Sequence, residues 1–183
     1  VNFKIIEDRC LIALQGPDSF SAISPILNLS SSMKFLDIKL LEYENTNVFI
    51  SRSGYTGEDG FEISILNNIS ENFVQKIIQN KNTILCGLGC RDSLRMEAGL
   101  SLYGNELNEK INPIQAGLSW ALDKSRLKDK NLNCFQVLSE EINTSQSIKR
   151  IGLSPVNKSM LRAQMILYNE NNKEIGKITS GCY

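Results

Sequence analysis

The chain has 183 residues, of which 42% are hydrophobic and 22% are charged, as in ordinary soluble globular proteins. Its 20 Lys and Arg residues balance its 20 Asp and Glu residues, so no basic surplus points to nucleic acid. No apolar run is long enough to span a bilayer, and no signal peptide is recognisable. We therefore expect a soluble protein in a reducing compartment, with neither a nucleic-acid nor a membrane partner.

Histidine is absent from the sequence, which excludes a Ser-His-Asp or Cys-His nucleophile within the chain. Any acid–base chemistry must use carboxylates, tyrosine or lysine. The five cysteines are odd in number and scattered, and only two of them lie four residues apart. Without a second such pair or a histidine, no metal site is expected.

The first 85 residues predict strands alternating with helices. The pattern predicts strands at 10–14, 33–43, 47–52 and 61–66. Helical spacing covers residues 17–27 and 69–78, and the second helix is expected to have an Asn or Ser cap. The polar residues 44–47 form a plausible hairpin turn between the two middle strands. This order predicts an α+β fold with an antiparallel sheet and helices on one face.

A glycine-rich turn separates the third and fourth of these strands. Gly54, Gly57 and Gly60 recur every three residues. Glycine accepts positive φ without steric cost, so the spacing suits a tight turn with an exposed backbone. No helix begins directly after it, so a phosphate cradle is not indicated.

The strand after this turn carries an acid on its polar side. Phe61 and Ile63 alternate with Glu62, which places the Glu62 side chain on the opposite face of the strand. A carboxylate there can accept two hydrogen bonds from one planar partner, either a guanidinium group or an aminopyrimidine edge of the pterin type. A solvent-exposed acid at a strand edge is the plainer interpretation.

A second glycine- and charge-rich segment spans residues 86–104 and predicts a loop that enters a helix. Helical spacing puts Arg91 and Arg95 on one side with small and apolar residues, which indicates a face that points inward. An inward guanidinium needs a carboxylate from the protein or from a ligand. Arg95 is expected to be structural.

The remaining residues predict a second region. Trp120 is expected in the core, and residues 135–141 as a short helix. Residues 142–147 resemble a hinge, so we expect domains at 1–147 and 148–183. Strand-like stretches at 149–153, 165–168 and 174–180 look like the opening strands of a β-barrel or sandwich that the chain does not complete. Because the chain starts at Val1 within an apolar run, we expect an internal piece of a longer protein.

These segments resemble the T-protein of the glycine cleavage system, the tetrahydrofolate-dependent aminomethyltransferase. The resemblance runs from residue 11 to the end, in the family's order and spacing. It is carried by LQGP at 14–17, SGYTGEDGFE at 53–62, GLGCRDSLRMEAG at 87–99, LYG at 102–104 and ITSG at 178–181.

The resemblance implies a three-domain fold around a folate cleft, in which residues 1–147 belong to the folate-binding region and 148–183 begin a C-terminal barrel. It implies an enzyme of glycine catabolism that takes an aminomethyl group from the lipoyl arm of the H-protein. The one-carbon unit would pass to tetrahydrofolate with release of ammonia. The resemblance implies localisation in a bacterial cytoplasm or a mitochondrial matrix.

The resemblance also assigns roles to residues. It implies that Glu62 binds the pterin end of folate and that Arg91 belongs to the substrate-binding set. The plainer role for Arg91 is an ion pair with Asp92, Glu97 or Glu62. Tyr55 either contacts the ligand or packs over the glycine turn. The family's main catalytic aspartate would lie before Val1 and a further arginine after Tyr183, so no catalytic residue is expected in this chain.

Other functions remain open from the sequence. One is a folate-dependent relative with another one-carbon donor, such as the folate domain of a dimethylglycine or sarcosine oxidising enzyme, or a sulfonium demethylase. Residues 54–62 do not exclude these relatives, whereas residues 87–104 favour the T-protein. A folate-binding repair factor is expected to show a lysine-glycine-cysteine motif, which this sequence lacks. The last option is an inactive fragment that binds folate.

Overall fold

The computed structural model describes residues 2–123, 125–143 and 148–182. The described chain divides into two compact units, residues 1–98 and residues 99–183, which are treated separately below. The predicted domain boundary at 147/148 adjoins residues 144–147, which lie outside the described residues, and it stays a prediction. Among the described residues, no helix combines the length and the apolar character needed to cross a bilayer.

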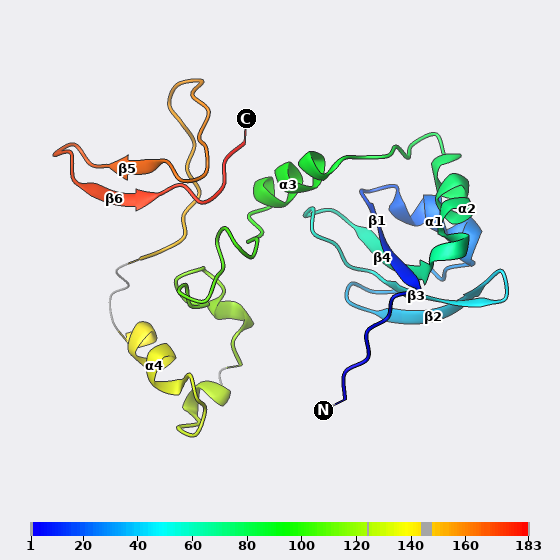
Figure 1. The fold of residues 1–183 in the computed structure, drawn as a ribbon, viewed down its shortest axis with the longest axis horizontal. Coiled ribbons are helices and arrows are strands. Elements are labelled where there is room, and N and C mark those ends of the chain that lie inside the picture. The colour runs from blue at the N-terminus through cyan, green and yellow to red at the C-terminus, as the bar shows by residue number, and fades with distance from the viewer. Residues whose placement is uncertain (1, 124, 144–147, 183) are drawn as a thin grey trace. The chain divides into compact units, whose positions relative to one another are not determined.

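The first unit is built on a four-stranded antiparallel sheet with the order β1-β4-β3-β2 (Figure 1). Its strands are β1 (Arg9–Gln15), β2 (Ile38–Tyr43), β3 (Thr46–Ser51) and β4 (Gly60–Leu66). Strand β4 lies between β1 and β3, with Glu62 opposite Ala13 on one side and opposite Ser51 on the other. The glycine turn therefore connects two neighbouring strands, as the sequence predicts.

Helices cover one face of this sheet. Helices α1 (Ser19–Leu27) and α2 (Asn67–Ile78) pack against each other and against β4 on the same side of the sheet (Figure 1). The side chains between the layers form the buried core of the unit: Leu14, Ile23, Leu27, Tyr43, Val48, Ile50, Phe61, Ile63, Ile65, Phe73 and Ile77. The predicted α+β fold, with helices on one face of an antiparallel sheet, is confirmed.

Besides the strand expected at 33–43, which begins only at Ile38, two local features differ from the predictions. The hairpin turn is shorter than expected, because only Glu44 and Asn45 separate β2 from β3, and both have positive φ. This is the backbone that a two-residue hairpin loop with matching twist requires. The second difference is that α2 follows Leu66 without a side-chain cap, because the strand runs directly into the helix.

The opposite face of the sheet carries exposed apolar side chains. Leu11, Leu40 and Phe49 point to this side and are exposed by 68%, 55% and 47%. Arg9 packs across it with its guanidinium 5.2 Å from the centre of the Phe49 ring. We call this surface the open face.

The second unit contains less regular structure. It has short 3₁₀ turns η1 (Ser119–Ala121) and η2 (Arg126–Lys128), helix α4 (Phe135–Asn143), and an antiparallel pair of strands β5 (Ile166–Tyr168) and β6 (Glu174–Lys177). Helix α4 and the two strands agree with the predicted elements. The prediction that these strands open a β-barrel stays a prediction.

Two predictions for this unit are wrong. Trp120 is 80% exposed, since it sits on a single 3₁₀ turn whose neighbours Ser119 and Ala121 are exposed too. Residues 149–153 form no strand. Arg150 instead bonds through its backbone N–H to the Gln115 carbonyl and through its side chain to the Gly99 carbonyl, at 2.9 and 2.7 Å.

The amide side chain of Gln15 fills the inside of the glycine turn. Its Nε2 donates to the carbonyl oxygens of Ser53 and Phe61, at 3.1 and 3.3 Å, and so joins the two ends of the turn. Its Oε1 accepts from the Thr56 hydroxyl at 3.3 Å. A Cβ atom on Gly54 would lie 1.7 Å from the Gln15 side chain, and one on Gly60 would lie 2.5 Å from it. Neither glycine has positive φ; the two make room for the Gln15 side chain, which would have to shift to admit a Cβ at either position.

An ion pair closes the base of the same turn. Arg52 donates from Nε and Nη2 to the two carboxylate oxygens of Asp59, at 2.8 and 2.7 Å. It also donates to the Met33 carbonyl at 2.5 Å and lies 5.8 Å from the centre of the Phe61 ring. Hydrogen bonds from Arg52 hold the pKa of the Asp59 carboxyl below its usual value. The two-point pairing fixes the spacing between the turn's ends.

Replacing Gly60 by alanine tests the packing of Gln15. The new Cβ would displace an amide held by three hydrogen bonds, so we expect Gly60→Ala to lower the free energy of unfolding by about 1–3 kcal/mol. In a Gln15→Ala background the same substitution should cost much less. Gly89→Ala is the matched control, since no atom lies within 4 Å of its added Cβ. Urea unfolding of the four variants measures these differences, and an unchanged stability of Gly60→Ala would contradict the packing role.

The Arg52–Asp59 pair predicts a pH dependence of stability. Because the folded-state pKa of Asp59 is lowered, the pair stabilises the fold above the unfolded pKa of about 3.9 and loses this effect as the pH falls through the folded pKa. Asp59→Asn should therefore lower the melting temperature at pH 7, and the gap to the unsubstituted chain should close as the pH falls below the unfolded pKa of about 3.9. In an Arg52→Met background the pH-dependent gap should be absent. A gap that persists undiminished in acid would show that the pair is not its source.

Candidate functional site

Glu62 lies on the open face of the sheet. The neighbouring residues Phe61 and Ile63 on β4 are fully buried in the core, whereas Glu62 is half-buried on the other side. The alternation predicted from the sequence is therefore confirmed. The Glu62 Oε2 atom accepts a hydrogen bond of 2.6 Å from the Ser53 hydroxyl, at the start of the glycine turn. The carboxylate is thus held in place at one oxygen.

Arg91 and Tyr55 lie together. Arg91 belongs to the first turn of helix α3 (Leu88–Glu97), and its guanidinium carbon lies 4.8 Å from the centre of the Tyr55 ring in the glycine turn. The end of α3 also approaches this turn, since a Cβ on Gly57 would lie only 2.6 Å from the Ala98 Cβ. Gly57 has φ of 79°, so both its backbone and its surroundings call for glycine. The turn and the helix form one local structure.

Of the two arginines predicted to point inward from α3, only one does so. Arg95 is 1% exposed and donates from Nε to the Asp92 carboxylate at 2.8 Å, whereas Arg91 is exposed. The expectation that Arg91 points inward is therefore wrong. Helical spacing puts the two arginines on one side, but it does not say which turn of the helix is covered. Among the residues that the structure describes, Arg91 has no ion pair, and Asp92 pairs with Arg95 instead.

The site offers two different binding elements. The first is a half-buried carboxylate with one oxygen already hydrogen-bonded, which can accept further N–H groups. The second is a guanidinium stacked on an aromatic ring, which can pair with an anion while its face stays packed. Tyr55 packs against Arg91, and whether it contacts a ligand stays a prediction. The ligand-binding roles of Glu62, Arg91 and Tyr55 remain proposals.

The sequence did not predict that Gln15 and Ser53 hold the turn and the Glu62 carboxylate. Gln15 and Ser53 are distant from each other in the chain, yet the Gln15 amide bonds the Ser53 carbonyl. Residues 51 and 53 lie two apart just before the turn, a spacing that puts both side chains on one face when the backbone is extended. Predicting that this face meets Glu62 also required the register of β3 against β4, which pairs Ser51 with Glu62.

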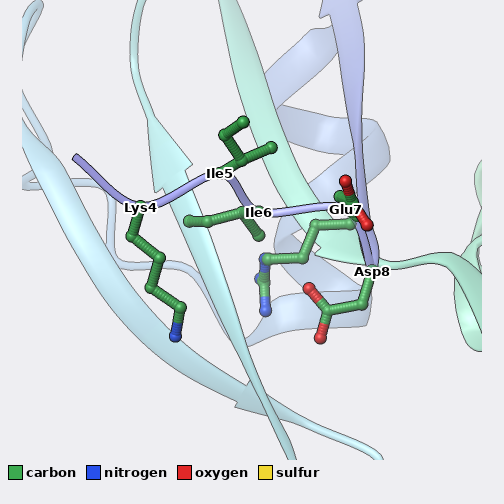
Figure 2. A pocket seen from close by; sticks show the side chains of 6 residues that line it. Lys4, Ile5, Ile6, Glu7 and Asp8 are labelled. Carbon is green, nitrogen blue, oxygen red and sulfur yellow. The ribbon is translucent and has the colours of Figure 1, made fainter.

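A separate hollow lies along the segment before β1 and involves none of these residues. Figure 2 shows its lining, which is Lys4, Ile5, Ile6, Glu7, Asp8 and Arg9. Ile5 and Ile6 are themselves exposed, by 82% and 60%. This hollow brings no predicted site residue to a ligand. In residues 2–123, 125–143 and 148–182, no three potential metal ligands gather.

Comparisons with known proteins identify the family. Residues 2–126 match the family described as the GCVT N-terminal domain. The mitochondrial aminomethyltransferase of Flaveria anomala is 37% identical over 99% of this chain and 45% of its own length. The yeast mitochondrial aminomethyltransferase (Saccharomyces cerevisiae) is 37% identical over 98% of this chain and 48% of its own length.

A solved structure agrees with these relatives. The glycine cleavage system aminomethyltransferase T from Bartonella henselae matches 96% of this chain and 48% of its own, with a TM-score of 0.85 and 34% identity. The chain thus spans about half the length of the relatives that it matches. Since the family match covers more than half of the chain and the fold agrees, the chain belongs to the GCVT family, that of the glycine cleavage T-proteins.

Proposed function

We propose that the protein containing this chain is the aminomethyltransferase of the glycine cleavage system. It would take the aminomethyl group from the lipoyl arm of the H-protein, pass the one-carbon unit to tetrahydrofolate and release ammonia. The observation that carries this proposal is the match to the Bartonella aminomethyltransferase T over 96% of the chain. The relatives named above carry the same enzyme name.

The open face supports a folate site at Glu62. The 2-amino group and a ring N–H of a reduced pterin form a planar edge with two parallel donors, which suits a carboxylate. Glu62 is half-buried, and Ser53 donates a hydrogen bond to its Oε2. The residue opposite Glu62 on β1 is the small Ala13. A flat ring can approach such a carboxylate without displacing a large side chain. These residues therefore fit the pterin end of tetrahydrofolate.

We assign Arg91 to the anionic or polar part of the bound substrate, with Tyr55 as the ring that orients it. Stacking on Tyr55 limits the positions of a side chain that is otherwise long and flexible. We assign no residue of this chain to the chemical step itself. The H-protein is the proposed macromolecular partner.

The proposal extends to the chain's organisation and place in the cell. Residues 1–147 would belong to the folate-binding region, and residues 148–183 would begin a C-terminal β-barrel. The names of the plant and yeast relatives place those proteins in mitochondria. The proposed locations are the mitochondrial matrix in a eukaryote and the cytoplasm in a bacterium.

The proposed reaction can be tested directly with the full-length protein. Incubation with H-protein that carries an aminomethyl-lipoyl group and with tetrahydrofolate should release ammonia and form methylenetetrahydrofolate. Parallel reactions with dimethylglycine, sarcosine or a dimethylsulfonium compound as donor should give no product. Turnover of one of these donors in place of the loaded H-protein would assign the protein to a different folate-dependent reaction.

Glu62→Ala should weaken the binding of tetrahydrofolate to the full-length protein. Loss of the acceptor leaves the pterin donors unpaired, at a cost of about 1–3 kcal/mol, or roughly a tenfold to hundredfold rise in Kd. Calorimetric titration measures this change. Glu71→Ala is the matched control, an exposed acid on α2 on the other side of the sheet, and should bind as the unsubstituted protein does. An unchanged Kd for Glu62→Ala would overturn the assignment of Glu62.

A further inference from the structure

Two serine hydroxyls and the Glu62 carboxylate form a connected chain on the open face. Ser51 Oγ lies 2.7 Å from Ser53 Oγ, and Ser53 Oγ lies 2.6 Å from Glu62 Oε2. All three groups are shielded in part from solvent. Two of them, Ser51 and Glu62, face each other across β3 and β4. The geometry is therefore set by strand pairing and not by side-chain rotation alone.

The number of protons fixes the direction of this chain. An ionised carboxylate can only accept, so Ser53 must donate its single proton to Glu62. Ser53 then has no proton left for Ser51, and Ser51 must be the donor in the contact between the two hydroxyls. The other acceptor near Ser51, the Glu62 carbonyl, is more distant at 3.5 Å. The order of donation is Ser51 to Ser53 to Glu62, with each bond strengthening the next.

The backbone of Ser53 is held independently of its side chain. Its carbonyl accepts from the Gln15 amide at 3.1 Å, and Arg52 beside it is paired with Asp59. The hydroxyl therefore starts from a fixed position at the end of β3. On Glu62, only Oε2 receives a hydrogen bond from the described residues, so Oε1 is left for another donor.

We propose that Ser53 is a positioning residue for Glu62, which fixes the carboxylate so that Oε1 and the remaining lone pair of Oε2 face a planar ligand edge with two N–H donors. The proposal rests on the proposed function, in which that edge belongs to the pterin of tetrahydrofolate. It adds a source of specificity. A carboxylate held in its acceptor form pairs with an edge of two donors and leaves an edge containing an acceptor unpaired.

The test uses the full-length protein, with tetrahydrofolate as the probe in calorimetric titrations. Ser53→Ala should raise Kd by roughly tenfold, since it removes a hydrogen bond to a charged group. Ser53→Thr, which keeps the hydroxyl, should bind within about twofold of the unsubstituted protein, and Ser53→Cys, a weak donor, should fall between. Ser70→Ala is the control, because the Ser70 hydroxyl bonds only the local Asn67 carbonyl on α2.

A double-mutant cycle separates positioning from a general structural role. If Ser53 acts through Glu62, Ser53→Ala should have no further effect on Kd in a Glu62→Ala background. Equal losses in both backgrounds would overturn the proposal, as would a Kd for Ser53→Ala equal to that of the unsubstituted protein. Failure of the unsubstituted protein to bind tetrahydrofolate is a different result, and it would reject the proposed function together with this inference. The Ser53→Thr variant keeps the test decisive if the alanine variant fails to fold.

Discussion

The contact between the Gln15 amide and the glycine turn is the constraint on which the first unit depends. The amide ties the carbonyl of Ser53, in the loop that follows β3, to the carbonyl of Phe61 on β4. Gly54 and Gly60 leave space for the amide in this position, because a Cβ on either would overlap the Gln15 side chain as it lies here. The motif therefore needs its glycines and its glutamine together, although about 40 residues separate them in the chain.

The two faces of the sheet differ in what they carry: one holds the core, and the other holds the proposed binding residue Glu62. Phe61, Ile63 and Ile65 are fully buried on the helix-covered face and supply the apolar burial that stabilises the unit. Glu62 alternates with them and points the other way, so it can be substituted without opening a cavity in the core. The loop that follows β3 adds Ser53 to the same face.

Much of this arrangement could be predicted from the sequence where the signal is local. Period-two alternation placed Glu62 on the face opposite Phe61 and Ile63, because a strand repeats every two residues regardless of its partners. Helical spacing placed Arg91 and Arg95 together but could not show that only Arg95 is covered, since burial depends on what packs against each turn.

The features that could not be predicted depend on contacts between segments that are distant in the sequence. Gln15 and Ser53 meet because of strand pairing, and no pattern in either segment reports the other. Trp120 was expected in the core because large aromatic residues are usually buried there, yet a 3₁₀ turn of three residues gives it no second layer to pack on. Strand-like composition at residues 149–153 likewise lacked a pairing partner. The proposed function came from the resemblance to a known family, which these local rules do not reach.

Glu62 is only partly buried, and the chain of serine hydroxyls stabilises its carboxylate in that position. A fully buried carboxylate without a partner would be neutralised or would destabilise the fold, whereas a fully exposed one would gain little by exchanging water for a ligand. One hydrogen bond from Ser53 compensates part of the lost hydration of the carboxylate and leaves its other oxygen open to a donor from a ligand. Arg95 shows the other solution in the same chain, since it is buried and bonded to a carboxylate of its own helix. The half-buried position of Glu62 suits its proposed role of binding an outside partner, and the Ser53 hydroxyl holds one of its oxygens in that position.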